Sequence, residues 1–232
     1  MTGNIYLIPV TLGGEDFLKV IPEKVIALTK LLRYFIVEDI RSARRFLRLI
    51  DRGFPINDSI FFELNEHTGN SDISHYLDPL LKGFDIGIMS EAGLPGIADP
   101  GAKIISIAHQ KNIRVIPLSG PSSIILALVS SGLNGQNFSF NGYLPVKPIE
   151  RTARIRDLEN RAREGYAQIF METPYRNQKL FDSIITTCKN DTMLCIAADL
   201  TLPSESIRTM NISEWKRNRP SLKDKLVIFV LQ

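Results

Sequence analysis

The stretch Ser90-Glu91-Ala92-Gly93-Leu94-Pro95-Gly96-Ile97-Ala98-Asp99-Pro100-Gly101 decides the fold. It follows the apolar run 85–89, which is typical of a buried strand, and it precedes the helical pattern 102–110. Such a loop lies at the carboxyl end of a parallel strand, where open α/β sheets bind ligands. An ordinary strand-to-helix turn with Asp99 near the helix start is the simpler interpretation. Because three glycines and two prolines exceed what a turn needs, we predict a stiff backbone cradle for a small molecule.

Strands and helices alternate through the first half of the chain. The predicted strands are 4–8, 34–37, 59–64, 86–89 and 114–116. The predicted helices are 22–32, 42–49, 71–81 and 102–110. This alternation indicates an α/β fold with a parallel sheet and helices on both of its faces.

The pattern restarts with a helix after residue 118. The later predicted helices are 122–129, 149–164 and 175–188, and the strands are 138–143, 167–171, 193–198, 206–210 and 226–231. The last strands follow one another closely, which favours a mixed sheet. We therefore predict two α/β domains, residues 1–118 and 119–232.

Composition excludes several classes of protein. The 232 residues include 28 Lys and Arg, 25 Asp and Glu and 44% hydrophobic residues, with a formal net charge of +3. Disordered and collagen-like chains are excluded by this apolar content. Between Arg114 and Lys147 there is no charged residue or histidine, but glycines and prolines interrupt the segment, so it does not predict a membrane helix. It is typical of a junction buried in an inter-domain cleft.

Location and metal content follow from what the sequence lacks. No stretch offers the roughly 20 consecutive apolar residues of a membrane helix, and no signal-like segment follows Met1. Cys188 and Cys195 are predicted to be buried, reduced thiols, and the three histidines are scattered, so no metal site is expected. We predict a cytoplasmic protein that does not contact a membrane.

Two common nucleotide sites are not present. The first predicted strand runs into Pro9-Val10-Thr11-Leu12-Gly13-Gly14, without the G-x-G-x-x-G pattern of dinucleotide-binding proteins. The loop 90–101 also lacks the Gly-Lys-Ser/Thr ending of a P-loop. Nicotinamide chemistry and nucleotide hydrolysis are therefore not predicted.

An ordered set of motifs spans the chain from Gly3 to about Leu231. The motifs are Pro9 to Gly14, Glu38-Asp39-Ile40-Arg41, Asn65-Glu66, Ser90 to Gly101, Ser119-Gly120-Pro121-Ser122-Ser123, Gly142-Tyr143-Leu144-Pro145-Val146-Lys147, Glu172-Thr173-Pro174-Tyr175-Arg176 and Asp199-Leu200-Thr201. In order and spacing they resemble the tetrapyrrole (corrin and porphyrin) methylase superfamily. Within it, the chain resembles a divergent member of the bacterial 16S ribosomal RNA 2′-O-ribose cytidine methyltransferases.

The resemblance implies a fold, a cofactor and an assembly. It implies two α/β domains with S-adenosylmethionine in the cleft between them, and a homodimer. The N-terminal domain would carry the acceptor side and the cofactor loop, and the C-terminal domain would complete the cleft and the dimer. Carried over by position, the cofactor contacts are Pro9, Ser90, Glu91, Ala92, Gly93, Ile97, Ser122, Ser123, Met171 and Ala198.

Departures from the ribosomal pattern are concentrated on the presumed acceptor side. The family pattern has hydroxyls where this chain has Ile40 and Leu94, an amide at Gly14 and an ammonium at Leu202. We therefore expect a retained cofactor cradle beside an altered acceptor side.

One predicted helix could bind RNA phosphates. Its arginines, at a spacing that puts them on one face, are Arg41, Arg44, Arg45, Arg48 and Arg52. A charged helix face usually has no partner other than solvent, but such faces normally carry both acidic and basic residues. Here Asp51 is the one acid nearby. We therefore favour contact with nucleic acid. By contrast, the arginines of 149–164 alternate with acids, which predicts a salt-bridged solvent face.

Methyl transfer to a ribose hydroxyl depends on positioning and on a base that accepts the proton. The candidate bases are Glu38, Asp39 and Glu66, and Arg41 is placed to anchor a neighbouring phosphate. Each carboxylate has a structural alternative, a helix cap or an ion pair, and Asp39 stands where a cap is expected.

Three functions remain open from sequence. The first is an S-adenosylmethionine-dependent methyltransferase that modifies a ribose 2′-OH of ribosomal RNA, free or in the small subunit. The second is a methyltransferase of the same fold that acts on a tetrapyrrole-like small molecule, which the arginine face disfavours. The third is a non-catalytic paralogue that retains the cofactor or RNA surface, which the altered positions Ile40, Leu94 and Leu202 keep open.

Overall fold

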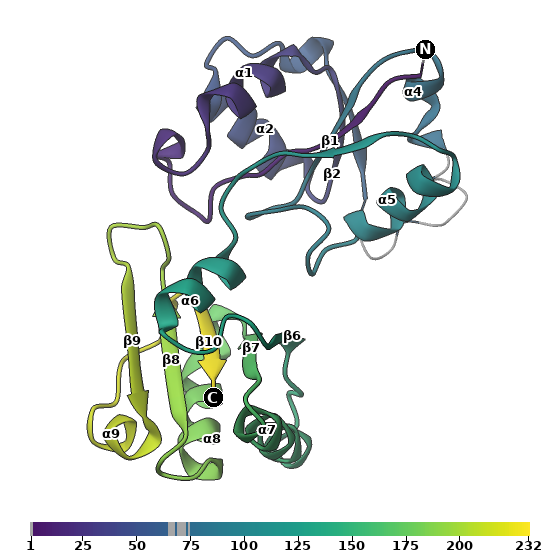
Figure 1. The fold of residues 1–232 in the computed structure, drawn as a ribbon. Helices are drawn as coiled ribbons and strands as arrows, with labels where there is room; N and C mark the ends of the chain where they lie inside the picture. The colour runs from purple at the N-terminus through teal and green to yellow at the C-terminus, as the bar shows by residue number, and fades with distance from the viewer. Residues whose placement is uncertain (1, 65–67, 69–72, 74) are drawn as a thin grey trace. The chain divides into compact units, whose positions relative to one another are not determined.

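The computed structural model describes residues 2–64, 68, 73 and 75–232, and the chain forms two compact units, Met1–Ser122 and Ser123–Gln232 (Figure 1). The sequence pattern placed the boundary four residues earlier, after residue 118. The first unit contains a five-stranded sheet in the order β3-β2-β4-β1-β5, and all its strand pairs are parallel. Its strands are β1 (Ile5–Leu7), β2 (Tyr34–Val37), β3 (Ile60–Glu63), β4 (Ile86–Met89) and β5 (Val115–Pro117).

Helices cover both faces of this parallel sheet, as the alternating pattern predicted. The helices are α1 (Glu23–Leu31), α2 (Ile40–Ile50), α4 (Asp78–Leu81) and α5 (Gly101–Gln110), with short 3-10 turns at Phe17–Lys19 and Ile56–Asp58. Successive residues of β2 point to opposite faces. Phe35 packs in a core with α1 and α2, whereas Ile36 packs in a second core with α4 and α5.

The second unit contains a mixed sheet in the order β6-β7-β10-β8-β9, which confirms that prediction. The β6–β7 pair is parallel, and the other three pairs are antiparallel. The strands are β6 (Phe138–Tyr143), β7 (Ala167–Met171), β8 (Met193–Ala198), β9 (Ser206–Asn211) and β10 (Val227–Leu231). The helices are α6 (Ser123–Ser131), α7 (Pro148–Arg163), α8 (Asn177–Thr187) and α9 (Ile212–Arg217), with a 3-10 turn at Pro174–Arg176.

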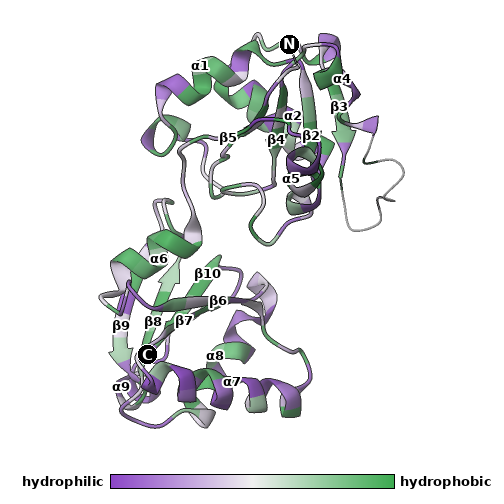
Figure 2. Cartoon of the chain, turned by 45° about the vertical axis from the view of Figure 1, so that its right-hand side comes forward, coloured by the Kyte–Doolittle hydropathy of each residue, from purple (hydrophilic) through white to green (hydrophobic). Residues whose placement is uncertain are grey.

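The two faces of the mixed sheet are covered differently. One face packs against α7, α8 and α9, and its core includes Phe170, Phe181 and Trp215. The other face carries α6, where the Thr209 hydroxyl of β9 donates to the Ser131 carbonyl at 2.7 Å. Figure 2 shows α6 as largely hydrophobic and α7 as largely hydrophilic. The sequence pattern did not predict α9. The main sign of this helix in the sequence is its capping box, formed by Asn211 and Glu214.

Helix α7 corrects one expectation, because two of its charged residues are buried. Arg151 is 4% exposed and donates to the Ser183 hydroxyl and the Val146 carbonyl, each at 3.0 Å. Glu159 is 5% exposed and accepts from the Lys189 N–H at 2.7 Å and from the Thr192 hydroxyl. Both side chains share the face of α7 that carries buried apolar residues, so packing withdraws them from solvent.

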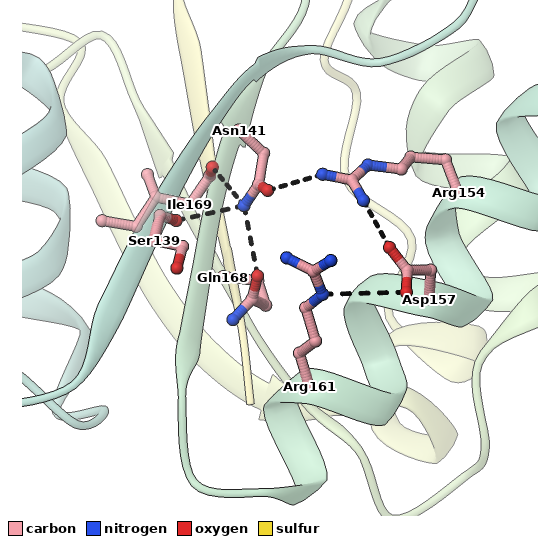
Figure 3. Close-up of polar contacts among 7 residues, drawn as sticks. All are labelled: Ser139, Asn141, Arg154, Asp157, Arg161, Gln168 and Ile169. Atoms are coloured by element: carbon pink, nitrogen blue, oxygen red, sulfur yellow. Dashed lines mark hydrogen bonds and ion pairs between the residues drawn. The ribbon is translucent and has the colours of Figure 1, made fainter.

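The more exposed charges of α7 do form the predicted ion pairs (Figure 3). Asp157 pairs with Arg154 and, at 3.7 Å, with Arg161. The Arg154 guanidinium also donates to the Asn141 side-chain oxygen of β6 at 2.8 Å. Asn141 in turn donates to the Gln168 side-chain oxygen of β7 at 3.2 Å. This network links α7 to the parallel strand pair β6–β7.

Some general features of the chain bear on its location and chemistry. None of the described helices is long and apolar enough to cross a membrane. Cys188 and Cys195 are buried and unpaired, as predicted, and burial raises the pKa of the Cys188 thiol to about 12. Among the described residues, no group of three or more His, Cys, Asp or Glu side chains is arranged to hold a metal ion.

The buried carboxylate of Glu159 should stabilise the second unit measurably. We expect Glu159→Ala to lower the free energy of unfolding by about 2 kcal/mol or more, because it leaves the Lys189 N–H and the Thr192 hydroxyl without their acceptor. Urea denaturation measures this loss. The control Glu164→Ala, at the exposed C-cap of the same helix, should change stability by less than about 0.5 kcal/mol. Equal effects of the two substitutions would contradict the role given to Glu159.

Candidate functional site

Four loops meet at the carboxyl edge of the parallel sheet in the first unit. Strands β2, β4, β1 and β5 are neighbours in that order, and all run in the same direction. The chain leaves them through the loops 38–39, 90–100, 8–16 and 118–122. Parallel strands deliver such loops to one edge, which is where α/β sheets bind ligands.

The loop after β4 is held against the loop after β1 by backbone pairing. The Val10 N–H donates to the Gly93 carbonyl at 2.9 Å, in an isolated antiparallel bridge. Gly93 has φ +72°, and a Cβ on it would lie 3.2 Å from the Leu12 side chain and 3.4 Å from the Pro121 carbonyl. Three loops therefore meet at this glycine, which has neither the backbone conformation nor the open space that a side chain needs.

A second glycine brings the loop after β5 against the loop after β1. A Cβ on Gly120 would lie 2.1 Å from the Cβ of Pro9, so only glycine permits this approach. Pro9, which forms this contact, and Ser122, two residues after Gly120, are both predicted cofactor contacts and are both buried.

Asp99 ties the far end of the 90–100 loop to the start of α5. Its carboxylate accepts from the Gly96 N–H at 2.8 Å and from the Gly101 N–H at 2.7 Å. Burial raises the pKa of Asp99, while the hydrogen bonds from Gly101 and Gly96 act in the opposite direction. The sequence left Asp99 only a place near the helix start in the simpler interpretation of this loop, whereas in the structure its carboxylate closes the loop on itself.

The tip of this loop presents backbone and apolar surface. Ser90 is half-buried, and Glu91 and Ala92 are exposed. Ile97 is 43% exposed despite its apolar side chain. These residues, with Pro9, Gly93 and Ser122, are the predicted cofactor contacts that belong to the first unit, and the structure places them on the adjoining loops described above.

Three predicted cofactor contacts belong to the second unit. Ser123 is the first residue of α6, and Met171 and Ala198 end β7 and β8. Met171 pairs with Ile228 and Ala198 pairs with Val227, so both strand ends flank the start of β10. Within this unit, the two residues therefore share one edge of the mixed sheet.

The predicted bases Glu38 and Asp39 stand between β2 and α2 in different surroundings. A Glu38 carboxylate oxygen accepts from the Glu91 N–H at 3.3 Å, so it contacts the loop after β4. Asp39 caps α2 and accepts from the N–H and hydroxyl of Ser42 at 2.6 and 2.7 Å. These hydrogen bonds lower the pKa of Asp39. The third predicted base, Glu66, lies outside the described residues.

A pocket that sequence reasoning did not find lies beside these groups. It has a volume of about 240 Å³ and is formed by the loop after β1, the first turns of α2 and the start of the loop after β4. Its polar lining includes Thr11, Glu15, Ser42, Arg45 and Glu91. The sequence signal was indirect, since these residues only follow strand ends that the topology brings together.

The arginine side chains of α2 are exposed, as the helical spacing predicted. Arg41, Arg44, Arg45 and Arg48 of α2 are exposed, while Ala43, Leu47 and Ile50 pack in the core. Arg52 is also exposed, but it lies beyond the helix end at Ile50 and its C-cap Asp51, so the prediction that it belongs to this helix face was wrong. In the part of the chain that the structure describes, none of the five lies within ion-pair distance of a carboxylate. Arg44 stacks over the Phe61 ring at 5.2 Å, and Arg48 donates to the Arg52 carbonyl at 3.0 Å.

Two of the departures from the ribosomal pattern lie at this pocket and helix. Gly14 lines the 240 Å³ pocket, so the missing amide leaves a smaller and less polar wall there. Ile40 begins α2 and packs against the core that also holds α1, so this helix start gains an apolar contact in place of a hydroxyl.

Comparisons with known proteins agree with this architecture. No family model matches the chain. A ribosomal RNA small subunit methyltransferase I from Streptococcus pyogenes is 30% identical over 213 residues, covering 92% of this chain and 70% of that protein. The protein of that name from Vibrio cholerae is 29% identical over 210 residues, covering 90% of this chain and 69% of that protein. The crystal structure of the methyltransferase CobJ matches with a TM-score of 0.63 at 17% identity, covering 99% of this chain and 94% of that one.

The fold is therefore that of a two-domain α/β methyltransferase. The chain belongs to the ribosomal RNA small subunit methyltransferase I family, which confirms the resemblance of its motifs.

The cap formed by Asp39 gives a pH-dependent prediction. We expect Asp39→Ala to cost about 1 kcal/mol at pH 7, because the start of α2 loses its acceptor. The pKa of Asp39 is lowered by folding, so the carboxylate contributes stability above its unfolded pKa, and this contribution is lost as the pH falls through the folded pKa. Urea denaturation should therefore show the difference shrinking below about pH 4. A cost of zero at pH 7, or one that grows in acid, would contradict the cap.

Proposed function

We propose that this chain transfers a methyl group from S-adenosylmethionine to a ribose 2′-OH of the RNA in the small ribosomal subunit. The observation that carries the proposal is the 240 Å³ pocket, which joins the glycine-rich loop after β4 to the arginine-bearing helix α2 within one unit. The named relatives, which are ribosomal RNA small subunit methyltransferases, support the substrate class.

The loop after β4 fits the cofactor by its backbone and by one apolar side chain. Its tip exposes Glu91 and Ala92, and Ile97 offers apolar surface of the kind that an adenosine group covers. Pro9, Ser90, Gly93 and Ser122 complete the contacts of the first unit, and we assign Ser123, Met171 and Ala198 as those of the second. When bound, S-adenosylmethionine supplies a methyl group on a sulfonium, an excellent leaving group.

The chain's own contribution is positioning and proton transfer. We assign Glu38 as the general base, because its carboxylate contacts the Glu91 N–H and so stands beside the loop that holds the donor. As the 2′ oxygen bonds to the methyl carbon and the carbon–sulfur bond breaks, Glu38 takes the hydroxyl proton. Asp39 fixes the start of α2, and Arg41 in its first turn anchors a phosphate of the acceptor. Glu66 remains a candidate base from the sequence.

The assembly and location are also part of the proposal. We infer a homodimer from the family resemblance, with the second unit contributing the interface, and light scattering after gel filtration would test it. A cytoplasmic location is supported by the ribosomal substrate and by the two buried, unpaired thiols.

Activity is tested with tritiated S-adenosylmethionine, purified protein, and either naked small-subunit RNA or assembled subunits as acceptor. We expect label in the RNA and one ribose methylation lost from the RNA of a deletion strain. No heat in calorimetry with S-adenosylmethionine at high protein concentration would rule out a methyltransferase. Binding without transfer to either acceptor would rule out the RNA substrate and leave a methyltransferase for a small molecule or a non-catalytic member of the family.

Gly93→Val should abolish S-adenosylmethionine binding without unfolding the protein. The added side chain would crowd Leu12 and the Pro121 carbonyl, and so displace the loop tip. Gly132→Val is the matched control, because Gly132 has the same φ of +72° but has nothing within 4 Å of its Cβ position. Both variants should lose similar stability from backbone strain, and calorimetry should show lost binding for Gly93→Val alone. Normal binding by that variant would show that the loop is not the cradle.

Arg44→Glu combined with Arg48→Glu should weaken RNA binding about tenfold or more and flatten its salt dependence, because phosphate contacts release fewer counterions. S-adenosylmethionine affinity should not change. The control is Lys103→Glu combined with Lys111→Glu, which makes the same change of charge at two exposed residues at α5 in the same unit. It should leave RNA binding and its salt dependence unchanged. An unchanged salt slope for the Arg44 and Arg48 variant would mean that this face of α2 is merely solvated.

A further inference from the structure

A second concentration of positive charge lies in the C-terminal unit, outside the site described above. From Ser206 to Leu226 the chain carries six Lys and Arg against two acids, Glu214 and Asp224. This segment therefore has a net charge of +4, more than the +3 of the whole chain. Glu214 is engaged in the capping box of α9, where its side chain accepts from the Asn211 N–H at 3.1 Å.

The segment folds around a pocket. The pocket has a volume of about 290 Å³ and is lined by the ends of β8 and β9, by Trp215 of α9 and by the loop 218–225. This volume is near the lower end of the roughly 300–1,000 Å³ typical of small-molecule sites. Three of the lining residues are cationic: Arg208, Arg219 and Lys225.

The pocket walls are anchored by hydrogen bonds to the core of the unit. The Trp215 indole N–H donates to the Leu194 carbonyl at 2.9 Å and fixes α9. The Leu222 N–H donates to the Gln178 side chain at 3.0 Å, and the Asn177 side chain donates to the Lys225 carbonyl at 2.7 Å. The loop 218–225 is thus held on α8, which gives its charged residues a defined position.

The three cations differ in how far they are neutralised. Lys225 pairs with the largely buried Asp199 at 3.6 Å, so its charge is mostly balanced. Arg219 reaches Asp182 only at 4.0 Å, between exposed side chains, where ion pairs contribute little. For Arg208, which is exposed on β9, no carboxylate lies within ion-pair distance among the described residues. Arg208 therefore offers its full charge to this pocket, and the charge of Arg219 is only weakly balanced by Asp182.

The remaining polar groups of the lining suit an anion. Ser206, Ser221 and Asn218 add hydroxyl and amide donors beside the guanidinium groups. Guanidinium forks match the geometry of phosphate oxygens bidentately. One more cation, the exposed Lys223, lies in the same loop between the lining residues Leu222 and Lys225.

We propose that the pocket of Arg208 and Arg219 binds a backbone phosphate of the RNA acceptor. This inference rests on the proposed function. It adds an RNA contact in the C-terminal unit to the RNA contact proposed for the arginines of α2. The exposed Lys223 adds positive charge to the loop that lines the pocket, which favours a polyanion over free phosphate. One wall residue, Ala198, is also an assigned cofactor contact, so cofactor affinity is measured separately.

The test uses Arg208→Ala combined with Arg219→Ala in the full chain. Its control is Arg156→Ala with Lys179→Ala, which removes two exposed charges from α7 and α8 of the same unit. The probe is a short fluorescein-labelled single-stranded RNA of mixed sequence, titrated at several salt concentrations. We expect about tenfold weaker binding and a salt slope shallower by about 1 to 2 for the pocket variant, and neither change for the control. Thermal unfolding and S-adenosylmethionine affinity should remain those of the wild type.

Each outcome decides between the possibilities. RNA affinity and salt slope equal to those of the control overturn the phosphate site. Heat from inorganic phosphate that is lost in the pocket variant, with RNA binding retained, identifies a free-phosphate site and also overturns it. A pocket variant that loses S-adenosylmethionine affinity assigns the pocket to the cofactor instead. Methyl transfer by the wild type is assayed in parallel. If the wild type transfers no methyl group but the pocket variant still binds RNA more weakly than the wild type, the proposed function is refuted and the phosphate site is not.

Discussion

The candidate site depends on the backbone hydrogen bond from the Val10 N–H to the Gly93 carbonyl. This bond holds the loop after β4 against the loop after β1, and the contact of Gly120 with Pro9 adds the loop after β5. A side chain at either glycine would force the loops apart. Asp99 then closes the far end of the long loop by accepting from two backbone N–H groups. A rigid arrangement of this kind positions a ligand without further ordering cost, which suits a reaction whose acceleration comes mainly from orientation.

Charge is distributed in three different ways on this chain. The arginines of α2 are exposed, and among the described residues no carboxylate lies within ion-pair distance of them, which leaves them available for contact with phosphates. The charges of α7 serve structure instead, through the network of Arg154, Asn141 and Asp157 and through the buried Glu159. The segment around Arg208 combines both, because Lys225 pairs with a largely buried aspartate and Arg219 with an exposed one, whereas no carboxylate among the described residues lies within ion-pair distance of Arg208. A net charge of +3 conceals all of these differences.

Most of the secondary structure could be predicted from local pattern. Strands β2, β4, β6, β7 and β8 begin and end where the apolar runs indicated. Most of the helices shifted by one or two residues, since caps such as Asp39 lie outside the apolar repeat. Helix α9 was missed because six residues with two buried side chains give too short a repeat, and the burial of Arg151 and Glu159 could not be found because their partners lie on other elements.

The sequence by itself determined the alternation of strands and helices, the arginine face of α2 and the family, because all three depend on spacing along one chain. Only the tertiary structure decided which residues share a pocket. Thr11, Ser42 and Glu91 meet because parallel strands β1, β2 and β4 deliver their loops to one edge, and Arg208 meets Arg219 because a loop folds back onto β9. These contacts join residues far apart in sequence, and no local pattern encodes the distance between them.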